Sequence, residues 1–367
     1  QVLLGLHLTH PKDAMCGYYR SRPILLSLGV ALEDALGSAM GRAGGYSDGR
    51  DIGVVFNYPN ANGASALPMC GGVGAQYTPT AGYAQAIEYA KNVLGDRSFD
   101  GAIGVVLGGD ASVATNGFWS ALTMATTLKL PLLFYIEDNG YGISTPGWLQ
   151  TPGQNIAKNL ASFSGLKICD GDGADPAEAS ELIADAVAHV RGGNGPALVH
   201  LVVPRLQGHS FQDTQAYKSK DVVDAEWARD PLPKLKAHVV PSLMSDGEWD
   251  KSDSEAKERV LRASQIAEQR PVAEPASVTR FADADPTGAT ALALVICLAS
   301  GLVHFWIVRG RRTSTLTETI ERLKAENAWL ALGERTGKAV HILRLSGIYG
   351  PGSNALVNLK RGTARRM

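Results

Sequence analysis

Short apolar segments that alternate with helical periodicity constrain the fold of this 367-residue chain most strongly. Each segment is too short for a helix of ordinary length and ends next to glycine or polar residues. The segments are 102–108 "AIGVVLG", 131–137 "PLLFYIE" and 197–203 "ALVHLVV". Continuously apolar strands separated by helices are typical of a parallel sheet covered on both faces. We therefore predict an α/β fold with helices on both faces of a parallel sheet.

Two of the connecting stretches carry helix signals. After the first strand, apolar residues recur at near-helical spacing, namely Phe118, Leu122, Ala125 and Leu128. After "LKICDGDG" (166–173), Asp175 is the expected N-cap, Pro176 occupies the first helical position and Glu178 completes a capping box. The predicted apolar stripe of this second helix comprises Leu182, Ile183, Ala186, Val187 and Val190.

Polar residues follow two of the predicted strands. Asp110 comes directly after the first strand, and Asn139 follows the second. Ligands of open parallel sheets bind beyond the carboxyl ends of the strands. A carboxylate, an amide oxygen and a backbone carbonyl would supply half of the octahedral shell that a hard cation such as Mg²⁺ prefers. We predict that Asp110, Asn139 and the carbonyl of Tyr141 are these ligands.

Small residues surround this aspartate. Gly109, Ala111 and Ser112 would allow diphosphate oxygens to approach backbone N–H groups at the start of the next helix, where the helix dipole favours anions. The alternative is that Asp110 is only a helix N-cap.

The stretch "GGDAS…EDNGYGIS" resembles the thiamine-diphosphate motif, which begins with Gly-Asp-Gly and ends with Asn-Asn. Residues 12–245 around it resemble the alpha subunit of the decarboxylating component of 2-oxo acid dehydrogenase complexes. The segment 17–22 "GYYRSR" matches that family, and the resemblance implies that Tyr19 and Arg20 contact the diphosphate.

Three further segments match the same family in the same order. In 70–86 "CGGVGAQYTPTAGYAQA", the resemblance places Gly71 and Val73 under the aminopyrimidine ring. In 203–218 "VPRLQGHSFQDTQAYK", it makes His209 a diphosphate-binding and catalytic histidine. The last match is 227–236 "WARDPLPKLK".

The resemblance implies a thiamine-diphosphate-binding fold with thiamine diphosphate and Mg²⁺ as cofactors. The implied reaction is oxidative decarboxylation of a 2-oxo acid, pyruvate or branched-chain, with transfer of the acyl group to lipoyl. In this family the beta subunit supplies the carboxylate that activates the cofactor, so we expect a beta-subunit partner in a heterotetramer. The resemblance also implies a second partner, a lipoyl-bearing acyltransferase. We expect a cytoplasmic location. An acetoin dehydrogenase alpha subunit and a catalytically degenerate subunit remain alternatives.

The chain departs from the motif at two positions. Ala111 stands where the motif has its second glycine, and Asp138 stands where it has its first asparagine. We expect the methyl group of Ala111 to be tolerated. Glu137 precedes the pair, as in many members of the family.

Simpler interpretations of the other residues stay open. In these interpretations Arg20 is a surface ion-pair residue, His209 is an ordinary loop histidine and "GGVGAQ" (71–76) is a tight turn. For "DGDGADP" (170–176) we favour a strand-to-helix turn over a calcium site, because the later acidic ligands are missing. The remaining histidines carry no motif and are interpreted as structural: His7, His10, His189, His200, His238, His304 and His341.

Composition excludes some classes of function. The chain has 35 basic and 36 acidic residues, a net charge of −1, so it lacks the basic excess of a nucleic-acid-binding protein. The cysteines show no CxxC spacing and are expected to be reduced thiols: Cys16, Cys70, Cys169 and Cys297. The chain starts with Gln1 and not with Met, and no signal peptide is visible in it, so we expect it to be a piece of a longer product.

The last third of the chain changes character. After the predicted domain 1–245, we expect a polar helical linker over 246–287 and an apolar segment with a basic flank over 288–312. The uncharged part, 292–308, nearly reaches the roughly 17–25 residues of a spanning helix. A span would put the preceding domain outside the cytoplasm, so we favour a junction. Residues 313–367 resemble an incomplete fragment of extended short-chain dehydrogenases and epimerases; without their nucleotide loop, no NAD-dependent activity is expected.

Overall fold

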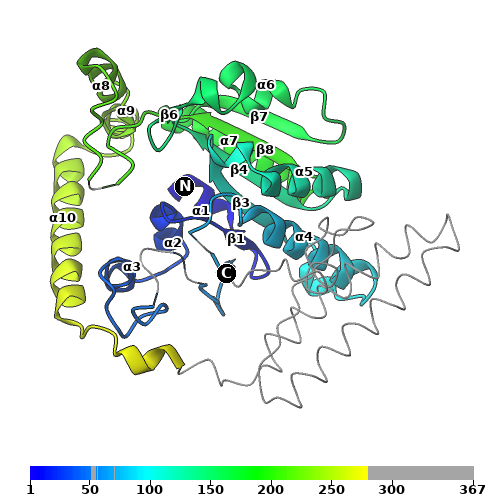
Figure 1. Ribbon diagram of the computed structural model, residues 1–367, viewed down its shortest axis with the longest axis horizontal. Helices are drawn as coiled ribbons and strands as arrows, with labels where there is room; N and C mark the ends of the chain where they lie inside the picture. Colours follow the sequence, from blue (N-terminus) through cyan, green and yellow to red (C-terminus); the bar gives the residue numbers. More distant parts are fainter. Residues whose placement is uncertain (51–54, 56, 70, 211, 280–367) are drawn as a thin grey trace, which may run out of the picture. The chain divides into compact units, whose positions relative to one another are not determined.

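The computed structural model describes residues 1–50, 55, 57–69, 71–210 and 212–279 (Figure 1). These residues belong to a compact unit that spans 1–286. The predicted apolar segment 288–312 and the predicted epimerase-like fragment 313–367 lie outside the described residues.

A six-stranded parallel sheet forms the centre of the unit, in the order β2-β1-β3-β4-β8-β7. The strands are β1 (Ala14–Cys16), β2 (Ser65–Ala66), β3 (Gly104–Gly109), β4 (Leu132–Asp138), β7 (Lys167–Asp172) and β8 (Ala197–Val202). The three predicted strands correspond to β3, β4 and β8, so the predicted parallel sheet is confirmed.

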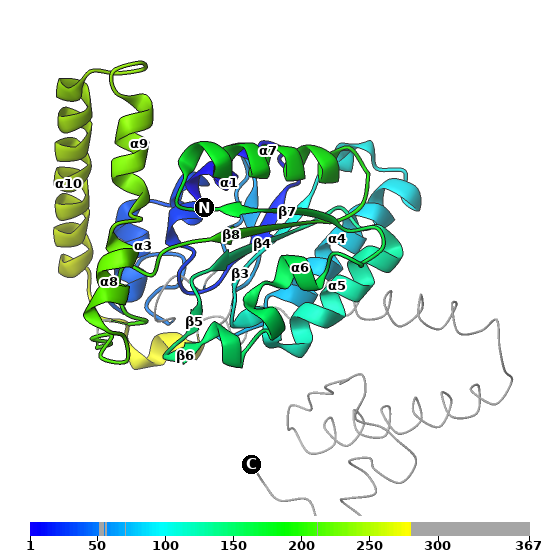
Figure 2. The same ribbon diagram turned by 90° about the horizontal axis from the view of Figure 1, so that it is seen from above.

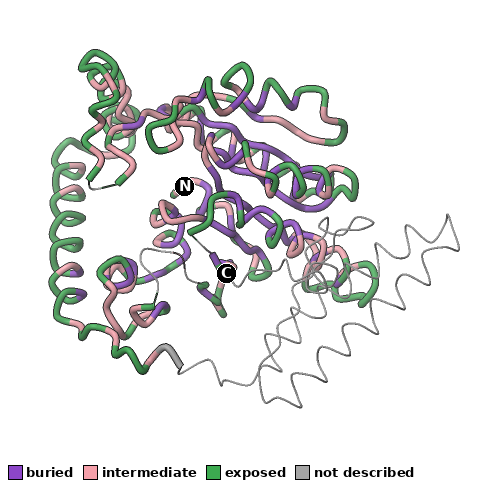
Figure 3. Tube along the Cα trace, viewed as in Figure 1, coloured by how far each residue is buried: buried purple, intermediate pink, exposed green. Residues whose placement is uncertain are grey.

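Helices cover both faces of this sheet (Figure 2). Successive residues of β3 alternate between the two cores: Val105 and Leu107 pack on one side, and Val106 on the other. The first face is covered by α1 (Val2–His7), α2 (Arg22–Ser27) and α7 (Pro176–Arg191). The second face is covered by α4 (Tyr77–Asn92), α5 (Asn116–Leu128) and α6 (Ile156–Asn159). Figure 3 shows the strands buried between these layers.

The helix α5 differs at its end from the predicted apolar stripe. Phe118, Leu122 and Ala125 are buried, but Leu128 is 40% exposed. The helix ends at Leu128, and Lys129 adopts a left-handed conformation with φ 52° that turns the chain away.

The helix α7 begins at the predicted N-cap. The Asp175 side chain accepts hydrogen bonds from the backbone N–H groups of Ala177 and Glu178. The predicted capping box is wrong, because the Glu178 carboxylate accepts the N–H of Asp172 at 3.0 Å instead of that of the N-cap. Asp172 in turn pairs with Arg229 at 2.7 Å. Because β7 ends at Asp172 and α7 begins at Pro176, "DGDGADP" joins a strand to a helix, as predicted.

The segment beyond residue 245 packs on the domain before it. The helix α10 (Asp246–Gln269) has the capping box of Ser245 and Glu248, and its buried Ala263 and Ala267 lie on the side that meets α3 (Leu32–Ala39). At its end, Arg270 forms an ion pair with Asp34 of α3 at 2.7 Å. The remaining helices are α8 (Lys220–Trp227) and α9 (Pro231–Val239). The boundary at 245/246 stays a prediction.

We predict that Asp175→Ala lowers the free energy of unfolding by about 1 kcal/mol, because two N–H groups at the start of α7 lose their acceptor. Urea denaturation of the purified chain measures this value. Glu181→Ala, an exposed change on the same helix, serves as the control and is expected to stay within about 0.5 kcal/mol of wild type. Equal stability of the two variants would contradict the assigned cap.

Candidate active site

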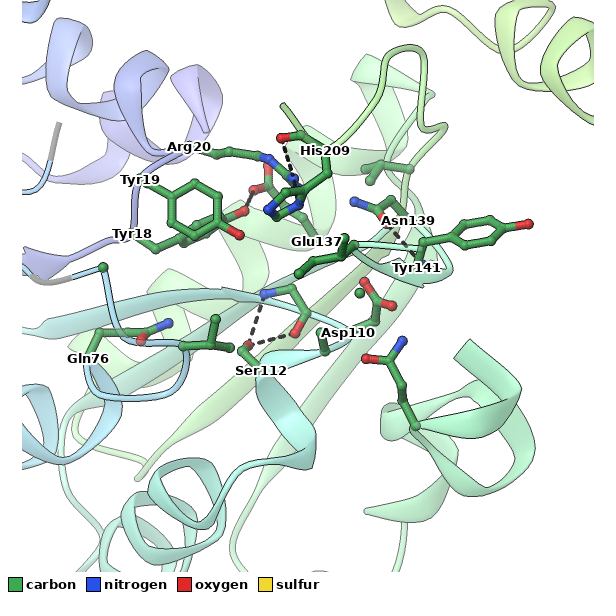
Figure 4. Close-up of a pocket in the computed structure, with 18 of the residues that line it drawn as sticks. Tyr18, Tyr19, Arg20, Gln76, Asp110, Ser112, Glu137, Asn139, Tyr141 and His209 are labelled. Atoms are coloured by element: carbon green, nitrogen blue, oxygen red, sulfur yellow. Dashed lines mark hydrogen bonds between the residues drawn. The ribbon is translucent and has the colours of Figure 1, made fainter. Parts of the chain in front are cut away.

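The carboxyl ends of β3 and β4 open into a cavity of about 620 Å³. Gly109 of β3 lies opposite Glu137 of β4, so the residues that follow both strands emerge side by side. All eleven predicted site residues line this cavity: Tyr19, Arg20, Gly71, Val73, Gly109, Asp110, Ala111, Ser112, Asn139, Tyr141 and His209. The eleven residues come from five separate segments of the chain. Figure 4 shows how side chains from these segments surround the space.

Asp110 is a buried carboxylate with an unused oxygen. The residue is 5% exposed, and its Oδ2 atom is buried without a hydrogen-bond partner. Burial, followed by the nearby charge of Asp138, raises its pKa to about 6, although the backbone N–H groups of Asn139 and of Asp110 itself act in the opposite direction. The N-cap of α5 is Thr115, so the interpretation of Asp110 as a helix cap is wrong.

Residues 138–141, which we call the metal loop after the predicted ligands Asn139 and Tyr141, form a tight turn at the end of β4. The Asp138 Oδ1 atom accepts the N–H of Gly140 at 2.9 Å, and the Asn139 Oδ1 atom accepts the N–H of Tyr141 at 3.1 Å. Gly140 has φ +76°, which a residue without a side chain adopts at little cost. A hairpin of β5 (Tyr141–Gly142) and β6 (Thr145–Pro146) continues from the turn.

The oxygen atoms of this edge fit a hard divalent cation. The three residues that carry these oxygens, Asp110, Asn139 and Tyr141, line the same cavity, and one Asp110 oxygen has no hydrogen-bond partner. The Tyr141 carbonyl has only a long contact, 3.5 Å, with Arg205. Within the described residues, no group of three or more His, Cys, Asp or Glu side chains gathers as a cation site. A cation held here would therefore need further oxygen ligands from a bound molecule such as a diphosphate.

The methyl group of Ala111 fits because a glycine faces it. A Cβ atom built on Gly142 would lie only 2.7 Å from the Ala111 Cβ. The metal loop and the turn after β3 therefore approach closely. Because residue 142 is a glycine, there is room for the methyl group of Ala111 where the motif has a glycine.

The Ser112 hydroxyl forms its hydrogen bonds within the protein and has none left for a ligand. Its Oγ atom lies 2.6 Å from the Tyr77 hydroxyl, donates to the Gly109 carbonyl at 2.6 Å and accepts the Gly109 N–H at 3.0 Å. These three bonds use its hydrogen-bonding capacity, so the hydroxyl fixes the turn. Ser112 begins a short 3₁₀ helix, Ser112–Ala114, that precedes α5, so residues 109–112 do not lie at the α-helix start that we predicted.

Arg20 and His209 meet across the cavity. The Arg20 Nη2 atom lies 2.7 Å from His209 Nδ1 and also donates to the His209 carbonyl at 3.2 Å. A guanidinium only donates, so Nδ1 accepts and the ring proton is on Nε2. Burial and the charges of Arg20 and Arg205 lower the pKa of His209. The Tyr19 ring packs edge-on against the imidazole at 5.8 Å. Arg20 thus contacts the cavity histidine and is no surface ion-pair residue.

Asp213, which the motifs did not indicate, orders the loop that carries His209. Its carboxylate accepts the N–H of His209 at 2.6 Å, the Tyr217 hydroxyl at 3.0 Å and the Arg205 guanidinium at 3.1 Å. Hydrogen bonds, above all from the His209 backbone, lower the pKa of Asp213 to about 2. The only sequence signal was that these residues share the segment 203–218 with His209.

The segment 71–76 is both a turn and a cavity wall. Gly74, with φ +87°, lies where a Cβ atom would approach the Thr115 side chain to 2.2 Å. Gln76 is buried and donates to the Leu107 carbonyl at 3.0 Å, which ties the segment to β3. Val73 is 56% exposed and presents an apolar side chain beside the cavity.

Glu137 was noted only as a neighbour of the motif, yet it lines the cavity. It accepts hydrogen bonds from the Tyr18 hydroxyl at 3.1 Å and the Gln1 amide at 2.7 Å. Burial, followed by the charge of Glu137, raises the pKa of Tyr18, so the phenol stays protonated and donates.

Comparison with known proteins gives the family. Residues 1–276 match the model of the dehydrogenase E1 component. The chain belongs to this family. The pyruvate dehydrogenase E1 component subunit alpha of Zymomonas mobilis is 28% identical over 279 residues, which cover 74% of each chain. The corresponding subunit of Porphyra purpurea is 27% identical, over 76% of this chain and 80% of its own.

A third relative carries a different substrate in its name. The mitochondrial 2-oxoisovalerate dehydrogenase subunit alpha of Caenorhabditis elegans is 29% identical over 71% of this chain and 58% of its own. The predicted resemblance to E1 alpha subunits and the predicted fold class are confirmed. E1 components are 2-oxo acid oxidoreductases that use thiamine diphosphate with a divalent metal, and their alpha subunits act in heterotetramers with beta subunits.

None of the helices in the described part of the chain combines the length and apolar character needed to cross a bilayer. The segment 292–308 lies outside that part.

We predict that Asp110→Asn stabilises the cation-free chain at pH 8 by about 2–3 kcal/mol, at 1.36 kcal/mol per pKa unit. The pKa of Asp110 is raised to about 6 on folding, so the folded state binds the extra proton and wild-type stability falls as the pH rises from 4 to 6. The advantage of the variant should therefore shrink from pH 6 to pH 4.

Urea denaturation in the presence of a chelator measures this difference, and Asp221→Asn, an exposed change on α8, provides the control. An Asp110→Asn chain that is less stable than wild type at pH 8 would show that the buried charge is already compensated.

Proposed function

We propose that this chain is an E1 alpha subunit that binds Mg²⁺ and thiamine diphosphate in the cavity at the ends of β3 and β4. The proposal rests on one observation: eleven residues from five segments line one cavity, and its buried carboxylate, Asp110, has an oxygen without a partner. The proposed substrate is a 2-oxo acid, pyruvate or branched-chain, because relatives named for both kinds match the chain.

In the proposed site, each wall holds a different part of the cofactor. Asp110, Asn139 and the Tyr141 carbonyl would hold Mg²⁺, and Gly109 and Ala111 would let the diphosphate approach the backbone. Arg20 and Tyr19 would contact the diphosphate from the opposite side. Residues 71–73 would lie against the aminopyrimidine ring. When bound, thiamine diphosphate supplies the electron sink for loss of carbon dioxide from the 2-oxo acid.

His209 is suited to proton transfer near this cofactor. Arg20 fixes the tautomer with the proton on Nε2, and the lowered pKa keeps the ring neutral at neutral pH. A neutral imidazole can donate this proton to an oxygen that gains negative charge. The Asp213 network holds the backbone of His209 in place.

The acceptor of the acyl group is proposed to be a lipoyl group on the acyltransferase of the same complex, and the beta subunit is proposed to complete the cavity. The cytoplasmic location stays a prediction. The epimerase-like alternative concerns residues 313–367, outside the described part of the chain.

We predict that Asp110→Ala abolishes Mg²⁺-dependent binding of thiamine diphosphate to the chain co-expressed with its beta subunit. The reason is that the only carboxylate among the three proposed protein ligands is lost. Isothermal titration calorimetry at several Mg²⁺ concentrations measures the binding. Asp175→Ala, an aspartate removed outside the cavity, should bind like wild type; unchanged binding by Asp110→Ala would refute the proposed site.

We predict that His209→Gln lowers kcat for decarboxylation and lipoyl acylation by about 10²–10⁴-fold, the usual contribution of a positioned acid or base. The Mg²⁺ dependence of cofactor binding should change much less, since the three proposed ligands remain. Steady-state kinetics with a panel of 2-oxo acids gives both kcat and the substrate preference. The control is His189→Gln on α7, away from the cavity; wild-type kcat in the His209 variant would exclude a role in catalysis.

A further inference from the structure

A buried histidine connects two carboxylates directly behind the metal loop. His200 of β8 is fully buried; its Nδ1 lies 2.7 Å from an oxygen of Asp170 in β7, and its Nε2 lies 3.0 Å from Asp138 Oδ2 at the end of β4. The parallel register places His200 beside Ile136 and Asp170, so Asp138, two residues beyond Ile136, is on the same face. We call Asp138, His200 and Asp170 the histidine bridge.

The geometry defines the charge of the histidine bridge. An ionised carboxylate only accepts hydrogen bonds, so two ionised partners are both satisfied when both ring nitrogens of His200 donate, as they do in an imidazolium. Burial opposes this protonation, but the hydrogen bonds to Asp138 and Asp170 outweigh it and raise the pKa of His200. Asp170 is held from its other oxygen by the Asn155 amide at 3.2 Å.

The bridge continues into the metal loop. The Oδ2 atom of Asp138 binds His200, and its Oδ1 atom accepts the N–H of Gly140 at 2.9 Å. One carboxylate thus joins a buried, charged ring to the turn that carries Asn139 and Tyr141.

We propose that His200, held by Asp170, is a positioning residue that fixes the metal loop through Asp138 and so determines how tightly the site holds Mg²⁺. The Mg²⁺ part of this inference rests on the function proposed above. Residues that orient metal ligands from behind commonly change metal affinity by about 10–100-fold when they are replaced.

His200→Gln tests the role in the full chain co-expressed with its beta subunit. Glutamine has one amide and cannot donate to carboxylates on opposite sides of the ring position. We expect faster hydrogen exchange in a peptide that covers Gly140, measured by mass spectrometry without any ligand. The Mg²⁺ concentration that half-saturates thiamine diphosphate binding should rise by about 10–100-fold.

Two Asp138 variants separate hydrogen bonding from packing. Asp138→Asn keeps an oxygen for the Gly140 N–H and an amide that donates to a neutral His200, so both readouts should stay near wild type. Asp138→Ala removes the carboxylate that joins His200 to the Gly140 N–H, so it should behave like His200→Gln. If His200→Gln does not fold, Asp138→Ala alone tests the proposal.

A stability control lies at the opposite end of the sheet. Arg191→Gln breaks the ion pair of Arg191 with the buried Asp13, 2.8 Å, just before β1. It should lower the midpoint of urea unfolding but leave Gly140 exchange and Mg²⁺ dependence unchanged.

The proposal is overturned if His200→Gln or Asp138→Ala retains wild-type Mg²⁺ dependence, or if Arg191→Gln changes it as much. A wild-type complex that binds no thiamine diphosphate at any Mg²⁺ concentration would refute the proposed function instead. In that case the exchange readout, which needs no ligand, still decides whether the histidine bridge holds the metal loop.

Discussion

The parallel pairing of β3 with β4 is the constraint on which the cavity depends. Gly109 lies opposite Glu137, so the next residues, Asp110 just after β3 and Asp138 at the end of β4, lie next to each other at the edge of the sheet. The apolar residues of both strands are buried under helices on each face, which leaves the sheet little freedom to shift this register. The packing of the core thus determines the spacing of the polar groups at its edge.

At this edge of the sheet, a carboxylate that is unfavourable to bury is also a proposed metal ligand. Asp110 and Asp138 are neighbouring carboxylates; Asp138 is hydrogen-bonded to the buried His200, whereas one oxygen of Asp110 has no hydrogen-bond partner. Burying a carboxylate without a partner is unfavourable, and a protein tolerates it where a ligand supplies the missing charge. A divalent cation bound at Asp110 would supply the partner that its buried oxygen lacks.

The sequence predicted the strands β3, β4 and β8, the helices α5 and α7, and eleven of the residues that line the cavity. These features could be predicted because apolar runs and motifs are formed by residues that are close together in the sequence. It did not predict the contacts between side chains from distant segments. His200 has no motif, and its role appears only when β7, β8 and β4 lie side by side. Glu178 binds Asp172 and not its own N-cap because the turn after β7 brings that N–H within reach. Ser112 is saturated because Tyr77, 35 positions away, reaches it.

The most direct test of the account is a crystal structure of the alpha–beta complex with Mg²⁺ and thiamine diphosphate bound. We predict one ion with ligand distances of about 2.0–2.1 Å to the Asp110 carboxylate, the Asn139 side-chain oxygen and the Tyr141 carbonyl. The diphosphate would complete the shell between them and Arg20. An ion bound by Asp138 in place of Asp110, or a cofactor outside this cavity, would contradict the account.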